Sequence, residues 1–233
     1  LRVDMFQQIN KGYTDVFHCS GVILGKATVL TAAHCFQHLK PRNLIVRVQA
    51  GVVDMKEFQI HQQYQSKCKI GDQCCYHNND IAIMWMRKNF IFGLYVQPAT
   101  LNGNIKKPVA KQGWILGWGR IAGNIKTTML HKGRVQIVPQ LECEKHHPLI
   151  HVTKNVMCVR GVKKSTASGL GDSGGPLVIG GVVYGILSMT LEKIRCSQEP
   201  LDIYTDVARY SDWIREELGL ETRRCESKSC TIL

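Results

Sequence analysis

A glycine-rich turn around a single serine carries the strongest chemical signal in this sequence of 233 residues. Residues 171–176 read Gly-Asp-Ser-Gly-Gly-Pro, with Ser173 at the third position. Glycines allow such a turn to hold a hydroxyl outward while backbone N–H groups converge on one point, where they can stabilise an oxyanion. A tight turn that merely contains serine is the alternative interpretation. The turn therefore predicts a nucleophile only if the chain also supplies a base.

A histidine and an aspartate upstream can serve as that base and its orienting partner. His34 stands in the run Thr-Ala-Ala-His-Cys at 31–35, which follows the apolar stretch 21–30. An imidazole, with a pKa of about 6.5, can take a proton from serine and return it to a leaving amine. Asp80 opens the apolar run 80–83 and could orient His34, although an aspartate at a strand start is more often a turn or cap residue. The other eight histidines lack such a setting and are predicted on the surface or in polar networks.

Short strand-like segments must position these side chains. Turns containing Gly, Asn, Pro and Lys separate the segments, a pattern that is typical of a β-sandwich or barrel. The predicted strands span residues 16–24, 44–48, 58–60, 114–116, 134–138 and 182–189.

The end of the chain has a helical pattern instead. Val207, Tyr210, Ile214 and Leu218 recur every three to four residues, and Gly219 follows as a stop signal. The sequence therefore predicts an all-β fold closed by one amphipathic C-terminal helix.

The segments around His34, Asp80 and Ser173 together resemble those of the chymotrypsin-like (trypsin-fold) serine peptidases. Their order along the chain is also the order in that family, and it differs from the order in subtilisin-like enzymes and α/β-hydrolases. Gly-Trp-Gly at 117–119 and Tyr-Thr at 204–205 extend the resemblance over nearly the whole chain.

The resemblance implies a fold of two six-stranded antiparallel β-barrels with a C-terminal α-helix. It assigns residues 1–220 to one trypsin-like peptidase domain and leaves 221–233 as a polar tail that carries Cys225 and Cys230.

It also implies a role for each site residue. His34 removes the proton of Ser173, which attacks the scissile carbonyl and forms an acyl-enzyme that water then hydrolyses. Asp80 holds the productive tautomer of His34, and the backbone N–H groups of Gly171 and Ser173 bind the oxyanion. The expected activity is that of a serine endopeptidase that needs no cofactor and no metal.

Two disulfides follow from the resemblance, Cys19 with Cys35 beside the histidine and Cys143 with Cys158 below the substrate pocket. The sequence does not choose partners for the remaining cysteines. These are Cys68, Cys74, Cys75, Cys196, Cys225 and Cys230.

One departure from the family lies at the start of the chain. In the family, cleavage frees an Ile-Val-Gly-Gly-like amino terminus whose ammonium group pairs with the aspartate before the nucleophile, here Asp172. No such motif precedes Cys19. The expectation is that the chain as given is truncated or that the site matures differently.

The specificity pocket is expected around four residues. Family alignment puts Ala167 at the pocket floor, Ser188 and Thr190 on one wall, and either Leu201 or Asp202 on the other. Leu201 in the pocket predicts small or medium apolar residues at P1, the substrate position before the cleaved bond, whereas Asp202 would attract Lys or Arg. The apolar preference is the prediction carried forward.

Composition limits the location and partners. Ten cysteines favour disulfides in an oxidising compartment, so the protein is expected outside the cell or in a secretory granule. The formal net charge of +12 allows binding to polyanions such as heparin. No apolar run reaches the roughly 18 residues of a membrane span, and membrane binding is not expected.

The expected partners are protein or peptide substrates, with serpin-type inhibitors or inhibitors that bind through a substrate-like loop as further candidates. Specific nucleic-acid binding is not expected, and a monomer is. Two alternative functions remain open at this point, a non-catalytic homologue of serine peptidases and a basic, polyanion-binding secreted protein.

Overall fold

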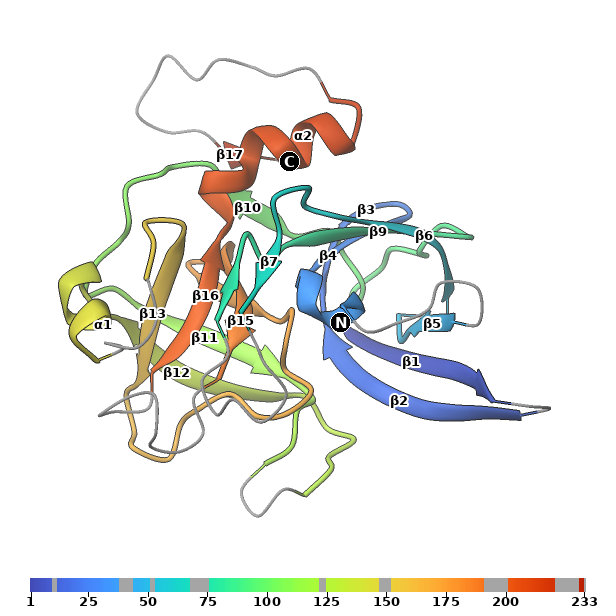
Figure 1. The fold of residues 1–233 in the computed structure, drawn as a ribbon, viewed down its shortest axis with the longest axis horizontal. Coiled ribbons are helices and arrows are strands. Elements are labelled where there is room, and N and C mark those ends of the chain that lie inside the picture. The colour runs from blue at the N-terminus through green and yellow to red at the C-terminus, as the bar shows by residue number, and fades with distance from the viewer. Residues whose placement is uncertain are drawn as a thin grey trace.

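A computed structural model describes most of the chain, and most of its regular structure is β-strand (Figure 1). No described helix is both long and apolar enough to span a membrane. The residues described are 1–9, 12–37, 44–50, 53–67, 76–121, 125–146, 152–190, 201–220 and 231–232.

The first half of the chain forms a seven-stranded sheet in the order β2-β1-β5-β6-β9-β4-β3. β2 and β3 continue one another across Gly21 and stand at the two ends of this order, so the sheet closes into a barrel of six extended segments. Its strands are β1 (Arg2–Ile9), β2 (Gly12–Ser20), β3 (Val22–Gly25), β4 (Thr28–Thr31), β5 (Leu44–Val48), β6 (Val53–Ile60) and β9 (Ala82–Met86).

The second half forms another closed barrel. The order β14-β11-β12-β13-β16-β15 is completed by pairing of β14 with β15, which gives six antiparallel strands. These are β11 (Gln112–Gly117), β12 (His131–Ile137), β13 (Val156–Gly161), β14 (Pro176–Ile179), β15 (Val182–Met189) and β16 (Asp202–Asp206). Outside this ring, β10 (Thr100–Asn102) runs parallel to β15, and β17 (Thr231–Ile232) pairs with β10.

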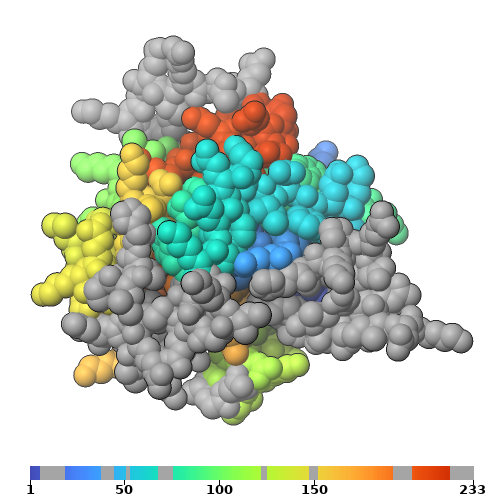
Figure 2. Space-filling model, viewed as in Figure 1, coloured from blue at the N-terminus to red at the C-terminus, as the bar shows by residue number. Residues whose placement is uncertain are grey.

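Four short helical segments and one small hairpin complete the described structure. The hairpin pairs β7 (Gln65–Ser66) with β8 (His77–Asn78). The helical segments are η1 (Ala33–Phe36), α1 (Gln140–His146), η3 (Val207–Tyr210) and α2 (Ser211–Glu217). In Figure 2 the C-terminal helix lies at the top of the molecule, and the cyan segment that leads into β9 crosses the middle of the visible face.

The C-terminal helix ties the two barrels together. Trp213 and Ile214 of α2 are buried in the same hydrophobic cluster as Val29 and Ile83 of the first barrel. Gly219 ends the helical region at a φ of 66°, a backbone conformation that glycine adopts without strain. Because the helix follows β16 directly, its burial against the first barrel fixes how the second barrel sits beside it.

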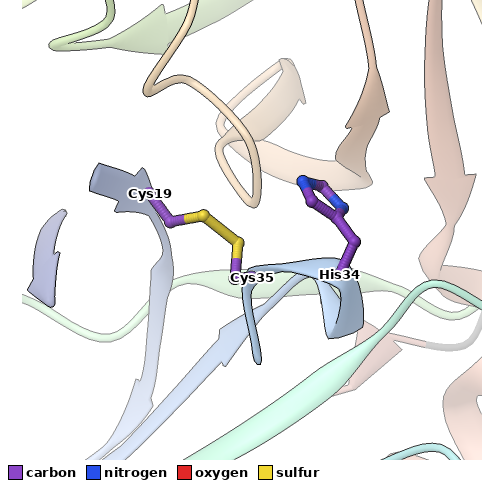
Figure 3. A group of neighbouring side chains, drawn as sticks. All are labelled: Cys19, His34 and Cys35. Carbon is purple, nitrogen blue, oxygen red and sulfur yellow. A yellow bond between two sulfur atoms is a disulfide. The ribbon is translucent and has the colours of Figure 1, made fainter. Parts of the chain in front are cut away.

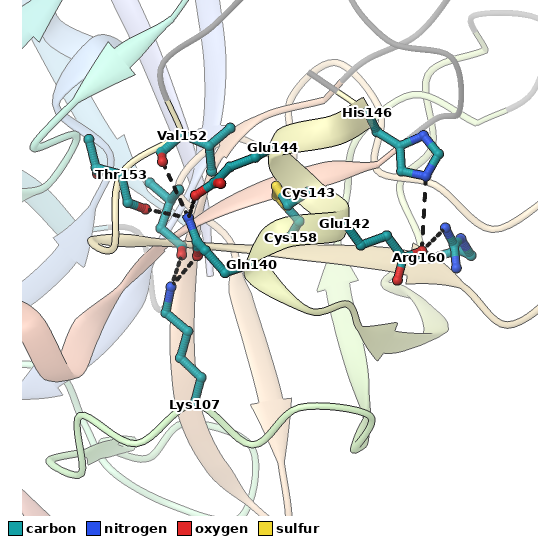
Figure 4. Close-up of a disulfide and its surroundings, with 11 residues drawn as sticks. Lys107, Gln140, Glu142, Cys143, Glu144, His146, Val152, Thr153, Cys158 and Arg160 are labelled. Carbon is teal, nitrogen blue, oxygen red and sulfur yellow. Dashed lines mark hydrogen bonds and ion pairs between the residues drawn. A yellow bond between two sulfur atoms is a disulfide. The ribbon is translucent and has the colours of Figure 1, made fainter. Parts of the chain in front are cut away.

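The Cys143–Cys158 disulfide fastens α1 to β13, and Figure 4 shows the polar groups around it. Lys107 Nζ donates hydrogen bonds to Gln140 Oε1 at 2.7 Å and to the Val156 carbonyl at 2.6 Å. Burial lowers the pKa of this lysine. The lysine links Gln140, at the start of α1, to the backbone of β13, so the helix is held by a polar contact as well as by the disulfide.

The fold prediction is confirmed. Segments 44–48 and 182–189 coincide with β5 and β15, and the predicted C-terminal helix is present as η3 and α2. The division at residue 220 stays a prediction. The six cysteines without assigned partners lie outside the described residues.

Candidate active site

His34 lies in the short helix η1, directly after β4. Its neighbour Cys35 forms a disulfide with Cys19 of β2, so the helix is pinned to the barrel on the side next to the imidazole (Figure 3). The two sulfurs and a ring nitrogen of His34 lie close enough together to suggest metal ligands. Because the sulfurs are bonded to each other, neither is available as a thiolate, and the group has a structural role.

Asp80 is buried beneath the imidazole, with a relative exposure of 1%. One carboxylate oxygen accepts a hydrogen bond from the His34 backbone N–H at 2.8 Å, and the other lies 2.8 Å from His34 Nδ1. Ser188 donates its hydroxyl to the second oxygen at 2.5 Å, and Thr205 donates to the Asp80 backbone carbonyl at 2.9 Å. Two strands of the second barrel therefore hold an aspartate that belongs to the first.

These contacts decide the charge of Asp80 and the tautomer of His34. Burial on its own would raise the pKa of Asp80, but the facing imidazole and its hydrogen bond, with smaller effects of His77 and Ser188, hold the pKa below its ordinary value. An ionised carboxylate only accepts hydrogen bonds, so the proton of neutral His34 resides on Nδ1. His34 Nε2 is then left as a proton acceptor.

The serine turn packs against the segments that carry Cys19 and His34. The Ser20 backbone N–H donates to the Ser173 carbonyl at 2.6 Å, and Ser20 Oγ donates to the Gly171 carbonyl at 3.1 Å. Gly174 has a φ of 80°, and a Cβ at this position would collide with Thr31 and Ser20. Within the described residues, the imidazole of His34 hydrogen-bonds to Asp80, while Ser173 reaches the cluster through its backbone.

Asp172 points away from this cluster toward a cavity of about 350 Å³. Its carboxylate accepts the backbone N–H groups of Gly119 at 2.7 Å and Gly169 at 2.9 Å. Burial raises the pKa of Asp172, and these two N–H groups act in the opposite direction. Side chains at Gly117 and Gly119 would overlap the carboxylate, which explains the Gly-Trp-Gly pattern seen in the sequence. Ala167, predicted at the pocket floor, also lines this cavity.

Asp202, rather than Leu201, faces Ser168 at the expected specificity pocket. Asp202 Oδ2 accepts the Ser168 backbone N–H at 2.9 Å and its hydroxyl at 2.7 Å, and the Thr190 hydroxyl donates to the Ser168 carbonyl at 3.2 Å. Leu201 is fully buried in the hydrophobic cluster around the Cys143–Cys158 disulfide. Of the two registers that the sequence leaves open, the structure therefore favours the one with Asp202 beside Ser168.

His77 is a neighbour of the site that sequence reasoning missed. Its ring stacks on that of His34 with centroids 5.0 Å apart and planes inclined by 13°. His77 Nδ1 lies 3.1 Å from the hydroxyl of Tyr64, which donates to Gln37 at 2.9 Å. Burial lowers the pKa of His77 to about 4; Asp80 opposes this shift and His34 adds to it. Only the short hairpin β7–β8 brings His77 to the site, and the sequence pattern did not reveal that hairpin.

The titration of His77 predicts a pH-dependent stability. Its pKa is lowered on folding, from an ordinary 6.5 to about 4, so the folded protein binds fewer protons than the unfolded chain between these values. The free energy of unfolding should therefore fall as the pH falls through this window, by about 2 to 3 kcal/mol from this group. Replacing His77 by Phe keeps a stacked ring and removes the proton.

Urea unfolding of the wild-type protein and of His77→Phe at pH 7 and pH 4.5 measures this contribution. Between pH 7 and pH 4.5, the free energy of unfolding of His77→Phe should rise relative to that of the wild type by about 2 to 3 kcal/mol. Tyr64→Phe serves as the control, since it removes the hydrogen bond to His77 and keeps the imidazole. A difference between wild type and His77→Phe that does not depend on pH would contradict the assignment.

The comparisons of this chain with known proteins all point to the same family. A profile of the family described as Trypsin matches residues 5–214. Kallikrein-8 of Homo sapiens is 32% identical over 209 residues, which cover 86% of this chain and 77% of that protein. Kallikrein-15 of Homo sapiens is 27% identical over 218 residues, which cover 87% of this chain and 82% of that protein. The solved structure of neuropsin, a serine protease expressed in the limbic system of mouse brain, matches with a TM-score of 0.73 at 27% identity and covers 93% of each chain.

Proposed function

The chain belongs to the trypsin family of serine endopeptidases, and we propose that Ser173, His34 and Asp80 are its catalytic triad. The observation that carries this proposal is the buried His34–Asp80 pair, which directs the basic nitrogen of His34 away from the carboxylate. The serine turn packs against Ser20 of β2 and Thr31 of β4, the strand that leads into His34. All three residue types of the triad are present, which disfavours the non-catalytic alternative.

The proposed reaction proceeds through an acyl-enzyme. His34 Nε2 accepts the hydroxyl proton as Ser173 Oγ attacks the scissile carbonyl, and the same nitrogen then protonates the leaving amine. Asp80 stabilises the imidazolium in both steps because its carboxylate stays ionised in the buried site. The backbone N–H groups of Gly171 and Ser173 are proposed as the oxyanion hole. Water then releases the acyl group by the reverse sequence of proton transfers.

Asp172 supports a maturation step in which a free amino terminus enters the neighbouring cavity. The described ion pairs do not include Asp172, although its carboxylate is largely buried. An ammonium group in the cavity would supply the missing positive charge and lower the pKa of the carboxyl group. It would also fix the turn that carries Gly171 and Ser173, because Asp172 lies between them.

Asp202 supports a preference for Lys or Arg at P1. A buried carboxylate beside the pocket residues Ser168 and Thr190 gives a cationic side chain an ionic partner. The apolar preference inferred from the sequence depended on Leu201, which packs elsewhere. We therefore propose cleavage after basic residues.

We also propose a location and further partners. Disulfides support a protein that acts outside the cell or in a secretory granule. Serpin-type or loop-type inhibitors remain predictions, as does the monomeric state. For polyanions such as heparin, the supporting feature is Trp114, whose ring lies beneath both Lys132 at 5.0 Å and Arg134 at 5.5 Å on the outer face of β11 and β12.

A fluorophosphonate probe tests the central proposal. The processed wild-type protein should form one covalent adduct, and mass spectrometry should map it to Ser173. Ser173→Ala should form none, whereas Ser211→Ala, at the start of α2, should react like the wild type. A folded, processed wild-type protein that remains unlabelled would instead favour the non-catalytic alternative.

A further inference from the structure

The loop from 87 to 99, which connects β9 to β10, exposes large apolar side chains. Ile91 is 90% exposed, Leu94 82% and Tyr95 93%, and Phe92 is 39% exposed. The first three are the most exposed large apolar side chains in the described part of the chain, and they lie within five residues. Isolated apolar side chains on a surface need no explanation, but a contiguous group usually marks an interaction site. These four residues are called the apolar tip.

The apolar tip is held out from the barrel by a fixed loop. Phe90, just before the tip, is buried in the core of the first barrel, and its backbone N–H donates to the Lys26 carbonyl at 2.6 Å. Within the tip, the Gly93 N–H donates to the Val96 carbonyl at 2.9 Å. After it, the Ala99 N–H donates to a carbonyl of β3 at 2.8 Å. A loop anchored on both sides presents its side chains without an ordering cost on binding.

Basic residues surround the base of the same loop. Lys26, Arg87 and Lys88 are all exposed, and the Lys26 carbonyl contact places the β3–β4 turn beside the tip (Figure 1). The nearby acids Asp54 and Glu57 pair with Arg47 and Lys56, respectively. No ion pair among the described residues includes the three basic residues at the loop. They are called the basic collar.

We propose that the apolar tip and the basic collar dock this protein on a bilayer that carries anionic phospholipid. The tip would enter the boundary between headgroups and acyl chains, and the collar would contact headgroup phosphates. This proposal goes beyond peptide hydrolysis and does not depend on it. Binding would be peripheral, because it uses four side chains of a loop. For the same reason, a search of the sequence for long apolar runs did not reveal it.

A bilayer fits these observations better than a protein partner. Stable protein interfaces use roughly 20 to 30 residues on each side and need a complementary shape. The apolar tip is one short loop. A bilayer accepts any protruding apolar group, and the two contributions that set interfacial affinity are buried apolar area and attraction between basic residues and anionic lipid. Both are present at this loop.

Sedimentation with lipid vesicles tests the proposal. The full chain should bind vesicles of phosphatidylcholine with a minor fraction of phosphatidylserine, and binding should weaken as salt is added. Leu94→Ser combined with Tyr95→Ser should lower the partition coefficient at least roughly tenfold, since two large apolar side chains no longer leave water. Leu141→Ser, at an 80% exposed leucine of α1, is the matched control and should bind like the wild-type protein.

A second pair of variants tests the charges. Arg87→Glu with Lys88→Glu should weaken binding to the same vesicles at least roughly tenfold. Lys163→Glu with Lys164→Glu changes the net charge equally at two exposed lysines after β13 and should have little effect. Thermal unfolding checks that each variant is folded, whether or not the protein is an active peptidase.

Any of four outcomes would overturn the proposal. The first is no binding of the wild-type protein to the anionic vesicles. The second is equal binding of the folded tip variant. The third is an equal loss with both charge reversals, which would indicate a general effect of net charge. A tip variant that changes only self-association or binding to another protein would reject the bilayer in favour of a protein partner.

Discussion

Replacing Asp80 by asparagine is expected to lower kcat/KM for a peptide substrate by roughly 10,000-fold, with no loss of the fold. One oxygen of Asp80 accepts the His34 backbone N–H, and the other faces His34 Nδ1. An amide has only one oxygen. If that oxygen keeps the backbone contact, the NH₂ group faces Nδ1 and moves the imidazole proton to Nε2. His34 can then no longer accept the proton of Ser173.

Hydrolysis of a chromogenic peptide by wild-type protein and Asp80→Asn measures this loss. Ser188→Ala is an informative companion, because it removes one hydrogen bond to Asp80 and leaves the carboxylate in place. Its loss should be about tenfold or less. Thermal unfolding shows whether Asp80→Asn is folded. A folded Asp80→Asn protein with near-normal activity would exclude Asp80 from the triad.

The chemistry-bearing residues could be predicted because they lie in short local motifs. The turn around Ser173 needs glycine at positions with φ values that other residues avoid, and Gly171 and Gly174 have such values in the structure. Apolar strands flank His34 and Asp80, and these strands also gave the fold class. Local sequence therefore specifies both the candidate triad and the elements that carry it.

The surroundings of the candidate triad depend on contacts between distant segments. His77 stacks on His34 although strands β5, β6 and β7 lie between them in the chain, and no periodic pattern marks that contact. Histidines other than His34 were expected on the surface or in polar networks. His77 does contact Tyr64, but it is buried, and its ring stacks on that of the candidate catalytic base.

The sequence leaves the register at the predicted specificity pocket open, because a strand has a period of two. Asp202 and Tyr204 share one face of β16, and the Tyr204 hydroxyl lies 3.3 Å from the same Ser168 hydroxyl that Asp202 accepts. Leu201 and Ile203 share the opposite face and contact the Cys143–Cys158 cluster. A shift of the register by one residue would move every side chain of the strand to the opposite face. The register of β16 against β13, Val159 opposite Asp202, removes the ambiguity.

Replacing Asp202 by asparagine is expected to lower kcat/KM for substrates with Lys or Arg at P1 by roughly 100- to 1,000-fold. Asparagine has nearly the same shape, and its oxygen can still accept the Ser168 backbone N–H. The change therefore removes the charge from the pocket and leaves the packing of β16. For a substrate with leucine at P1, kcat/KM should change by less than about threefold, because an apolar side chain has no ionic partner to lose.

A panel of peptides that differ only at P1 measures both numbers for wild-type protein and Asp202→Asn. Asp212→Asn, on the exposed side of α2, is the control for loss of one negative charge elsewhere, and it should leave the panel unchanged. A wild-type protein that prefers leucine or smaller apolar residues would reject cleavage after basic residues. The same conclusion would follow if kcat/KM of a folded Asp202→Asn protein fell by the same factor for every substrate. The carboxylate would then stabilise the pocket without interacting with the charge of the P1 side chain.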